Sequence, residues 1–316
     1  MICGQCGDQV FFRLRDGYLA ILGVGPMWDF TPEKPTAEQQ TTFYDTPWRD
    51  MMVNTAVIFS GVTRVGNGAF CKTSLQSIHL PDTLTEIGSW AFAETKLEDA
   101  WLLFDVQSIG THAFFGCACL RDVFLPENIR LGAYCFARTG MRRLRFRRKL
   151  ASAGKMAFWN NPDLTKVKLP PCGSLGYGVF DSCGLRQADL SESVLEHLPD
   201  YMFSDCEQLE TVLLPPRVAT LGTGSFMSTA LTELVLPETV TAFHPGDVIG
   251  SDKLKRIVFL GKKAPDCTEF SSFYQKDLEL VIREDAEGFD VMPWSGQPIV
   301  RMTEAELEKL ERKNKR

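Results

Sequence analysis

Residues 109–126 read IGTHAFFGCACLRDVFLP, and this pattern recurs along most of the chain. Its most regular feature is an aromatic slot, often preceded by alanine as in Ala113-Phe114. The slot falls at positions 70, 92, 114, 136, 158, 180, 203, 226 and 249, where the last residue is Ile249. The intervals are five of 22 residues followed by three of 23. A fixed period of this length indicates a chain of stacked structural repeats.

Apolar columns accompany the aromatic slot. In the quoted stretch the apolar residues end in alternation, which places Val123 and Leu125 on one face of a short strand. Proline often follows, as at Pro126, and ends the strand because it cannot donate to a ladder. A glycine before the aromatic, as at Gly110, permits a tight turn. One such unit cannot bury its apolar face alone, whereas stacked units share a core, so we predict a repeat solenoid that is mainly β with short turns and helical pieces.

We expect about nine coils of 22–23 residues, which at about 4.8 Å per strand span roughly 40 Å and present a concave strand face. The repeats define a solenoid over residues 51–260, with a cap at each end. Residues 1–50 form the N-terminal cap, because residues 10–22 alternate apolar and polar around the hairpin signal Asp16-Gly17. Residues 31–47 read as a loop.

The C-terminal cap is expected over residues 261–316. Residues 278–282 read as a strand. Thr303, followed three residues later by Glu306, is a capping box that opens a short terminal helix. Terminal repeats need polar covers, which explains why the repeat pattern stops before both ends of the chain.

The repeat resembles the BspA-like leucine-rich repeat family, whose units read approximately I-G-x-x-A-F-x-x-C-x-x-L-x-x-I-x-L-P-x-x-L. The quoted stretch matches almost every position, and the resemblance covers about residues 50–260. It also reaches both flanks, through Asp16-Gly17, Pro47-Trp48 and Ala264-Pro265. The resemblance implies a right-handed leucine-rich repeat superhelix. It further implies cell-surface or secreted proteins, some of them adhesins for host matrix proteins.

Several function classes find no support in the sequence. There is no nucleophile elbow, no Walker motif and no spaced pair of histidines, so we expect no enzyme, no cofactor and no metal site. Cys3 and Cys6 form a lone Cys-x-x-Cys without the second ligand pair that zinc needs. No apolar stretch reaches about eighteen residues, so we expect no membrane span. The N-terminus MICGQCGD lacks the features of a secretory signal, which keeps a cytoplasmic location open beside the cell surface.

The cysteines inside the repeats follow its columns. Cys117, Cys183 and Cys206 occupy the slot three residues after the aromatic, where other coils place small polar residues: Thr73, Thr95, Thr139, Asn161, Thr229 and Asp252. A slot that accepts these residue types requires a small side chain able to bond nearby backbone at a turn. We therefore interpret these thiols as packing residues of the core.

Charge is distributed unevenly along the chain. The net charge is −6, yet residues 121–168 contain twelve Lys and Arg against three acids, a net of +9, which leaves −15 for the remainder. The sharpest feature is the basic run of residues 142–149, RRLRFRRK. Leu144 and Phe146 fall in core columns, so this run is a strand within a coil rather than a flexible tail. A solvated or acid-paired surface and an anion-binding site are both compatible with it.

The candidate binding residues point away from the core, between the buried positions of successive strands. They form an aromatic and a basic zone, and the candidate ligand-binding residues are His79, Trp101, Phe124, Arg143, Arg145, Lys166 and Lys168. Exposed Trp beside Phe and Arg is typical of an interface hot spot. A third, aliphatic zone contains Leu213, Val235 and Val258, which either meet a partner or are covered by the C-terminal cap.

We therefore expect a non-enzymatic module that binds a protein or a glycan across the strand face, as in adhesion. The alternative is an intracellular scaffold that binds an acidic partner, nucleic acid or another polyanion through the basic coils near residues 142–149.

Overall fold

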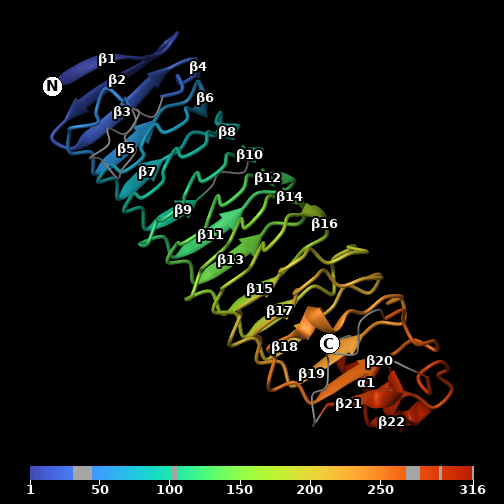
Figure 1. Cartoon of the computed structure of the whole chain (residues 1–316). Coiled ribbons are helices and arrows are strands. Elements are labelled where there is room, and N and C mark those ends of the chain that lie inside the picture. Colours follow the sequence, from blue (N-terminus) through green and yellow to red (C-terminus); the bar gives the residue numbers. More distant parts are fainter. Residues whose placement is uncertain (31–44, 102–104, 268–277, 292–293, 315–316) are drawn as a thin grey trace. The chain divides into compact units, whose positions relative to one another are not determined.

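The computed structural model describes residues 1–30, 45–101, 105–267, 278–291 and 294–314, and of residues 100, 101, 245, 295 and 311–314 it describes the backbone alone. The chain is a β-solenoid of about ten turns with a spacing of about 22 residues (Figure 1). It divides into two compact units, Met1–Leu164 and Thr165–Arg316. The predicted repeat solenoid is thereby confirmed.

Most coils of the first unit contribute two strands. The first belongs to a series that we call the outer strands, and the second belongs to a second series. The outer strands are β1 (Ile2–Gly7), β2 (Val10–Arg15), β3 (Tyr18–Gly23), β5 (Thr55–Ile58), β7 (Ser77–His79), β9 (Asp99–Trp101), β11 (Asp122–Leu125) and β13 (Arg143–Phe146). The other strands are β4 (Gly25–Pro26), β6 (Val62–Val65), β8 (Glu86–Ile87), β10 (Ser108–Ile109), β12 (Ile129–Leu131) and β14 (Leu150–Ala153). In the first series β3, β5 and β7 pair in parallel, as do β9, β11 and β13 in a separate sheet, and in the second series the strands pair in parallel from β4 to β14.

The N-terminal strands continue the outer sheet. The predicted hairpin is present as the antiparallel pair β2 and β3, whereas the additional strand β1, which pairs antiparallel with β2, was not predicted. Strand β3 in turn pairs in parallel with β5, so the hairpin joins the sheet of the first coils. Of the predicted loop, residues 31–44 lie outside the described residues.

The second unit continues the first series of strands, whereas its second series, among the described residues, consists of one strand and isolated bridges such as His197 with Thr220. Its strands are β15 (Lys166–Lys168), β16 (Cys172–Leu175), β17 (Gln187–Asp189), β18 (Thr211–Leu213), β19 (Glu233–Leu236), β20 (Arg256–Phe259), β21 (Glu279–Arg283) and β22 (Ile299–Met302). Its helical pieces are the 3-10 turns η1 (Pro245–Val248) and η3 (Trp294–Gly296) and the terminal helix α1 (Glu304–Asn314). The predicted C-terminal strand is β21. The predicted capping box is also present, because Thr303 N donates to Glu306 Oε2 at 2.9 Å and Glu306 N donates to Thr303 Oγ1 at 3.4 Å.

The aromatic slots form the centre of the core. Phe70, Phe92, Phe114, Phe136 and Phe158 are buried and stack with ring centroids 5.0–5.9 Å apart in the first unit. Trp48 begins this stack, 5.8 Å from Phe70, and adds the coil that the sequence count of nine missed. In the second unit, Phe180, Phe203 and Phe226 stack at 5.8 Å. Stacking one ring per coil fills the space between neighbouring turns, as the repeat predicts.

The last slot was predicted at Ile249, and this is wrong by one residue. Ile249 is 55% exposed, whereas Val248 is 2% exposed. The backbone agrees, because Phe226 N donates to Asp247 O at 2.8 Å, just as Phe203 N donates to Ser225 O at 2.9 Å. Pro245 fixes its own φ and opens the 3-10 turn η1, which brings Val248 to the core one residue early.

The polar slot after the aromatic bonds backbone, as predicted. Thr73 Oγ1 donates to Phe70 O at 2.8 Å, and Cys117 Sγ donates to Phe92 O of the preceding coil at 3.1 Å. Asn161 Nδ2 donates to the carbonyls of both Phe158 and Phe136. In the last coil Ser251, rather than the predicted Asp252, fills this slot and donates to Phe226 O at 2.8 Å. Within the described residues no helix is long and apolar enough to cross a membrane.

Candidate functional site

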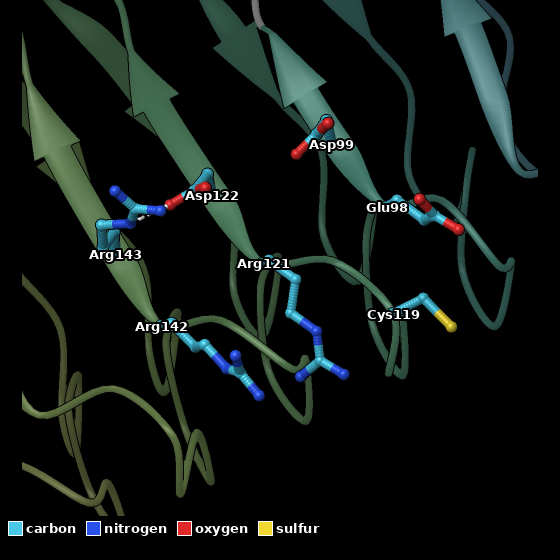
Figure 2. A pocket seen from close by; sticks show the side chains of 7 residues that line it. All are labelled: Glu98, Asp99, Cys119, Arg121, Asp122, Arg142 and Arg143. Atoms are coloured by element: carbon cyan, nitrogen blue, oxygen red, sulfur yellow. Dashed lines mark ion pairs between the residues drawn. The ribbon is translucent and has the colours of Figure 1, made fainter.

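A cleft of about 450 Å³ opens in the first unit where strands β9, β11 and β13 begin (Figure 2). All of its lining residues except one cysteine are charged, and both signs are present: Glu98, Asp99, Cys119, Arg121, Asp122, Arg142 and Arg143. A cleft of mixed charge on an open strand face can orient a partner that presents charges of both signs.

The repeat itself places these side chains together. Asp99, Asp122 and Arg143 are the first residues of three neighbouring parallel strands and lie in register. Arg121 and Arg142 immediately precede their strands, and Arg142 N donates to Arg121 O at 2.8 Å. Because equivalent residues of parallel neighbours lie about 4.8 Å apart, two residues per coil are sufficient to line the cleft.

Ion pairs fix the basic side of the cleft. Arg143 Nε lies 2.7 Å from Asp122 Oδ1, a pair that is drawn in Figure 2. Asp163 lies between the other two arginines, with its Oδ2 at 3.2 Å from Arg121 Nη1 and 3.8 Å from Arg142 Nε. Arg121 also donates to Gly140 O at 3.2 Å. These contacts hold the guanidinium groups in place before any partner arrives.

The acidic side is not paired. Glu98 and Asp99 are exposed, and within the described residues neither forms an ion pair. With Asp163 included, the cleft contains four carboxylates against three guanidinium groups. It therefore offers two available carboxylates beside three arginines that share two carboxylates, and the excess of one negative charge favours a partner with a basic group over a simple anion.

The sequence-predicted residues of the aromatic zone lie beside this cleft. Phe124 is half-buried on β11 and lies in register between Trp101 of β9 and Arg145 of β13. The backbone of Trp101 is in β9, but its side chain lies outside the described part of the structure. His79 ends β7 and is exposed.

The basic zone is divided between the two units and is partly neutralised. Arg143 and Arg145 are exposed on β13 of the first unit, and Lys166 and Lys168 are exposed on β15 of the second. Lys168 Nζ lies 2.8 Å from Glu192 and 3.8 Å from Asp189, and the hydrogen bond that Lys168 donates to Glu192 is the main cause that raises the pKa of this lysine. Arg145 and Lys166 form no ion pair among the described residues. Half of the zone is thus acid-paired, which is one of the two alternatives that the sequence left open.

The aliphatic zone is covered by the chain itself. Val258 is 2% exposed and packs in a cluster with Val281, Met302 and Leu307 of helix α1. Val235 and Leu310 of α1 pack against the same cluster. Of the two readings that the sequence allowed for these residues, the structure shows the cap for Val235 and Val258.

The thiols are poorly suited to chemistry. Burial raises the pKa of Cys6 to about 12 and that of Cys117 to about 11, and it also raises the pKa of Cys135 and Cys206. Cys3 is exposed and Cys6 is buried on the same strand β1, so the two sulfurs face opposite sides of the sheet and cannot chelate one ion. Across the described ranges, no cluster of three His, Cys, Asp or Glu side chains could hold a metal.

Sequence reasoning missed Glu98, Asp99, Arg121, Arg142 and Asp163. For Glu98, Asp99, Arg121 and Arg142 the signal that could have found them is their position, immediately before a strand or at its first residue, whereas Asp163 lies three residues before β15. The cleft is formed by side chains from neighbouring positions of successive coils, so no single column of the repeat predicts it.

Comparison with known proteins identifies the family of the repeats. The repeat pattern described as "BspA type Leucine rich repeat region" matches residues 41–165 and 130–255, in six copies. No curated protein matches the sequence.

Several solved structures are similar to this chain, and the first described here supports the fold. A leucine-rich repeat protein from Eubacterium ventriosum is 18% identical with a TM-score of 0.50, over 96% of this chain and 85% of that chain. A leucine-rich repeat protein from Bacteroides ovatus is 18% identical with a TM-score of 0.45, over 93% and 98%. A leucine-rich cell surface protein from Faecalibacterium prausnitzii is 16% identical with a TM-score of 0.43, over 96% and 98%. Because the repeat pattern covers more than half of the chain and the fold agrees with it, the protein belongs to the BspA-type leucine-rich repeat family.

Proposed function

We propose that the protein is a non-enzymatic binding module that holds a partner protein on the outward strand face of the first unit. The observation that carries this proposal is the open cleft at β9, β11 and β13, with its fixed arginines and its two unpaired carboxylates. BspA-type repeats are a binding scaffold, which agrees with this role.

The partner's chemistry follows from the charges. Glu98 and Asp99 offer two carboxylates to a lysine or arginine of the partner, and Phe124 offers apolar contact beside them. His79 and Arg145 extend the same outward face. Aromatic and arginine residues grouped around a desolvated centre are typical of protein interfaces. We propose protein rather than glycan for this reason, with adhesion at a cell surface as the setting that family resemblance suggests.

A second candidate is polyanion binding by the basic run, residues 142–149. The observation that favours it is that Arg145, Arg148 and Lys149 are exposed and form no ion pair within the described residues. Such binding would weaken steeply with salt, because it releases counterions from the polyanion.

The test is a binding screen against purified matrix proteins, heparin and duplex DNA at about 50 and about 200 mM salt. Wild type is compared with a cleft swap, Asp122→Arg with Arg143→Asp, which preserves the ion pair but reverses its direction. The matched control is Arg256→Glu with Glu279→Arg, which reverses the ion pair at the same repeat position in the second unit, 3.2 Å in length. We expect a matrix protein to bind wild type and the control, and to lose at least about tenfold in affinity for the cleft swap.

The other outcomes separate the candidates. Binding of heparin or DNA alone, with a steep salt dependence and loss on Arg145→Glu with Arg148→Glu, would replace the proposal by polyanion recognition. Binding of a matrix protein that survives the cleft swap would contradict the cleft as its site, and binding of none of the three classes would contradict the proposed function.

A further inference from the structure

The N-terminal outer sheet presents a row of large apolar side chains to solvent. Phe11 of β2 is 50% exposed and Phe59, directly after β5, is 44% exposed. Leu22 of β3 lies between them, because Phe11 pairs with Leu22 and Phe59 N donates to Ile21 O at 2.9 Å. Single exposed apolar residues are common, whereas a row across three neighbouring strands indicates a contact surface.

The next row has small side chains at its centre. Ala20 and Val57 are paired neighbours on β3 and β5, flanked by Arg13 on one side and His79 on the other. Tyr18, which is 45% exposed, lies in the row beyond. A strip of small side chains between larger aromatic ones accommodates the ridge of a helix.

In the second unit, a helix packs on the equivalent strand positions. Ala20 and Val57 correspond in the repeat to Val235 and Val258, which helix α1 covers through Leu307 and Leu310. Leu307 and Leu310 are three residues apart and so lie on one face of the helix. The chain thus already packs an amphipathic helix on its outward strand face, at β19–β22.

The charges of this surface indicate which kind of helix would bind it. Arg13 is exposed and forms no ion pair within the described residues, and Arg15 pairs only with its neighbour Asp16 at 3.2 Å. None of the outward residues in these rows on β2, β3, β5 and β7 is acidic. A helix with acidic residues beside its apolar stripe is therefore the complementary partner.

We propose that the outward face of β2, β3 and β5, centred on Phe11, Ala20, Leu22, Val57 and Phe59, binds an amphipathic helix of a partner protein that has acidic flanks. This inference rests on the proposed function in treating the outward strand face as a protein-binding surface, but it uses no residue of the cleft. The mode is a helix laid along an apolar surface, with anchors three and four residues apart.

The test is fluorescence anisotropy with three labelled peptides of about 18 residues, long enough to form a helix in isolation. The first has leucines at helical spacing with glutamate flanks, the second has lysine flanks, and the third is the glutamate peptide with a central proline that breaks the helix. We expect the acidic helix to bind at least about tenfold more tightly than either other peptide. Phe11→Ser with Phe59→Ser should remove this preference, and Arg13→Glu should weaken acidic binding several-fold.

Two control variants distinguish failure of this inference from failure of the proposed function. Phe124→Ser alters a half-buried aromatic residue of the same outward face outside this surface and should leave peptide binding unchanged, as should the cleft swap of Asp122 and Arg143. Equal binding of all three peptides, no binding at about 1 mM, or binding that survives the double phenylalanine variant would overturn the inference. Because the cleft swap affects only the proposed function, loss of matrix-protein binding with retained peptide binding would contradict that function alone.

Discussion

The outward strand face differs between the two units although the repeat beneath it is the same. On β11 and β13 this face presents Phe124, Arg143 and Arg145 and stays open beside a charged cleft. On β20 and β21 it presents Val258 and Val281, which helix α1 covers. The core columns hold the coils together in both units, so the alternate positions are free to vary. The polarity of these alternate positions differs in step with their cover: α1 covers the apolar face, whereas the polar face stays exposed.

The largest expected effect contrasts one repeat position in the two units. Val258→Asp places an unpaired carboxylate under α1, where Val258 is 2% exposed, and should destabilise the second unit by about 4 kcal/mol or more. Arg145→Asp at the equivalent exposed position should change stability by no more than about 0.5 kcal/mol. Urea unfolding curves of the two variants measure both values. Similar losses for the two would contradict the view that only one of the faces is covered.

A pH effect separates the buried acid of the second unit from the exposed acids of the cleft. Burial raises the pKa of Asp247 to about 7 from 3.8, and Asp200 adds to the rise while the His244 backbone N–H, which donates to Asp247, opposes it. In the unfolded chain this carboxyl ionises near pH 4, whereas the folded chain retains its proton up to about pH 7. Its contribution to stability is therefore present at low pH and is lost between about pH 4 and pH 7.

The loss is at most about 4 kcal/mol, at about 1.4 kcal/mol per pKa unit. Asp247→Asn retains an oxygen that accepts from His244 N–H and should remove this part of the pH dependence. The difference in urea midpoint between variant and wild type, followed from about pH 4 to pH 8, tests it. Parallel curves for the two proteins would show that Asp247 is already ionised in the folded state.

The register of the last coil gives a smaller contrast. Val248→Ala removes buried methyl groups and should cost about 1–3 kcal/mol, whereas Ile249→Ala, at a residue 55% exposed, should cost about 0.5 kcal/mol or less. Thermal unfolding of the two variants measures the contrast. The reverse order would restore Ile249 as the core residue that the period of 23 predicts.

The smallest expected effect concerns the two matched ion pairs. Asp122 with Arg143 and Arg256 with Glu279 are exposed pairs, so a double-mutant cycle on each should give a coupling of less than about 1 kcal/mol. The two couplings should be alike, since both join neighbouring strands at the same repeat position. A coupling of several kcal/mol for Asp122 and Arg143 would mean that the pair maintains the fold, and the cleft swap would then report on stability rather than binding.

The core was predictable from the sequence because each of its positions is a local pattern repeated many times. The period, the alternation around Val123 and the polar slot at Thr73 all follow from strand geometry and turn chemistry within one coil. Trp48 lies one period of 22 residues before Phe70, but it was missed as the first ring of the stack because a tryptophan after a proline differs from the phenylalanine of the other slots. Ile249 was misassigned because two aliphatic residues stand side by side and the 3-10 turn at Pro245 shifts which of them is buried.

The surface was less predictable because it depends on contacts between coils. The pairing of Arg143 with Asp122 joins residues 21 positions apart, and Asp163 reaches Arg121 across 42 positions. The cover on Val258 comes from a helix about 50 residues further along the chain, so the sequence left both readings of the aliphatic zone open. The division into caps at residues 1–50 and 261–316 stays a proposal about which segments protect the ends.

Hydrogen–deuterium exchange with and without the matrix protein retained in the binding screen shows which strand face binds. We expect slower exchange on binding in residues 97–101, 119–125 and 141–146, which surround the cleft, with no change in β19–β22 or α1. Protection confined to β19–β22, or faster exchange in α1 as it is displaced, would show that the partner binds the face that the chain covers itself and would refute the proposed role of the cleft.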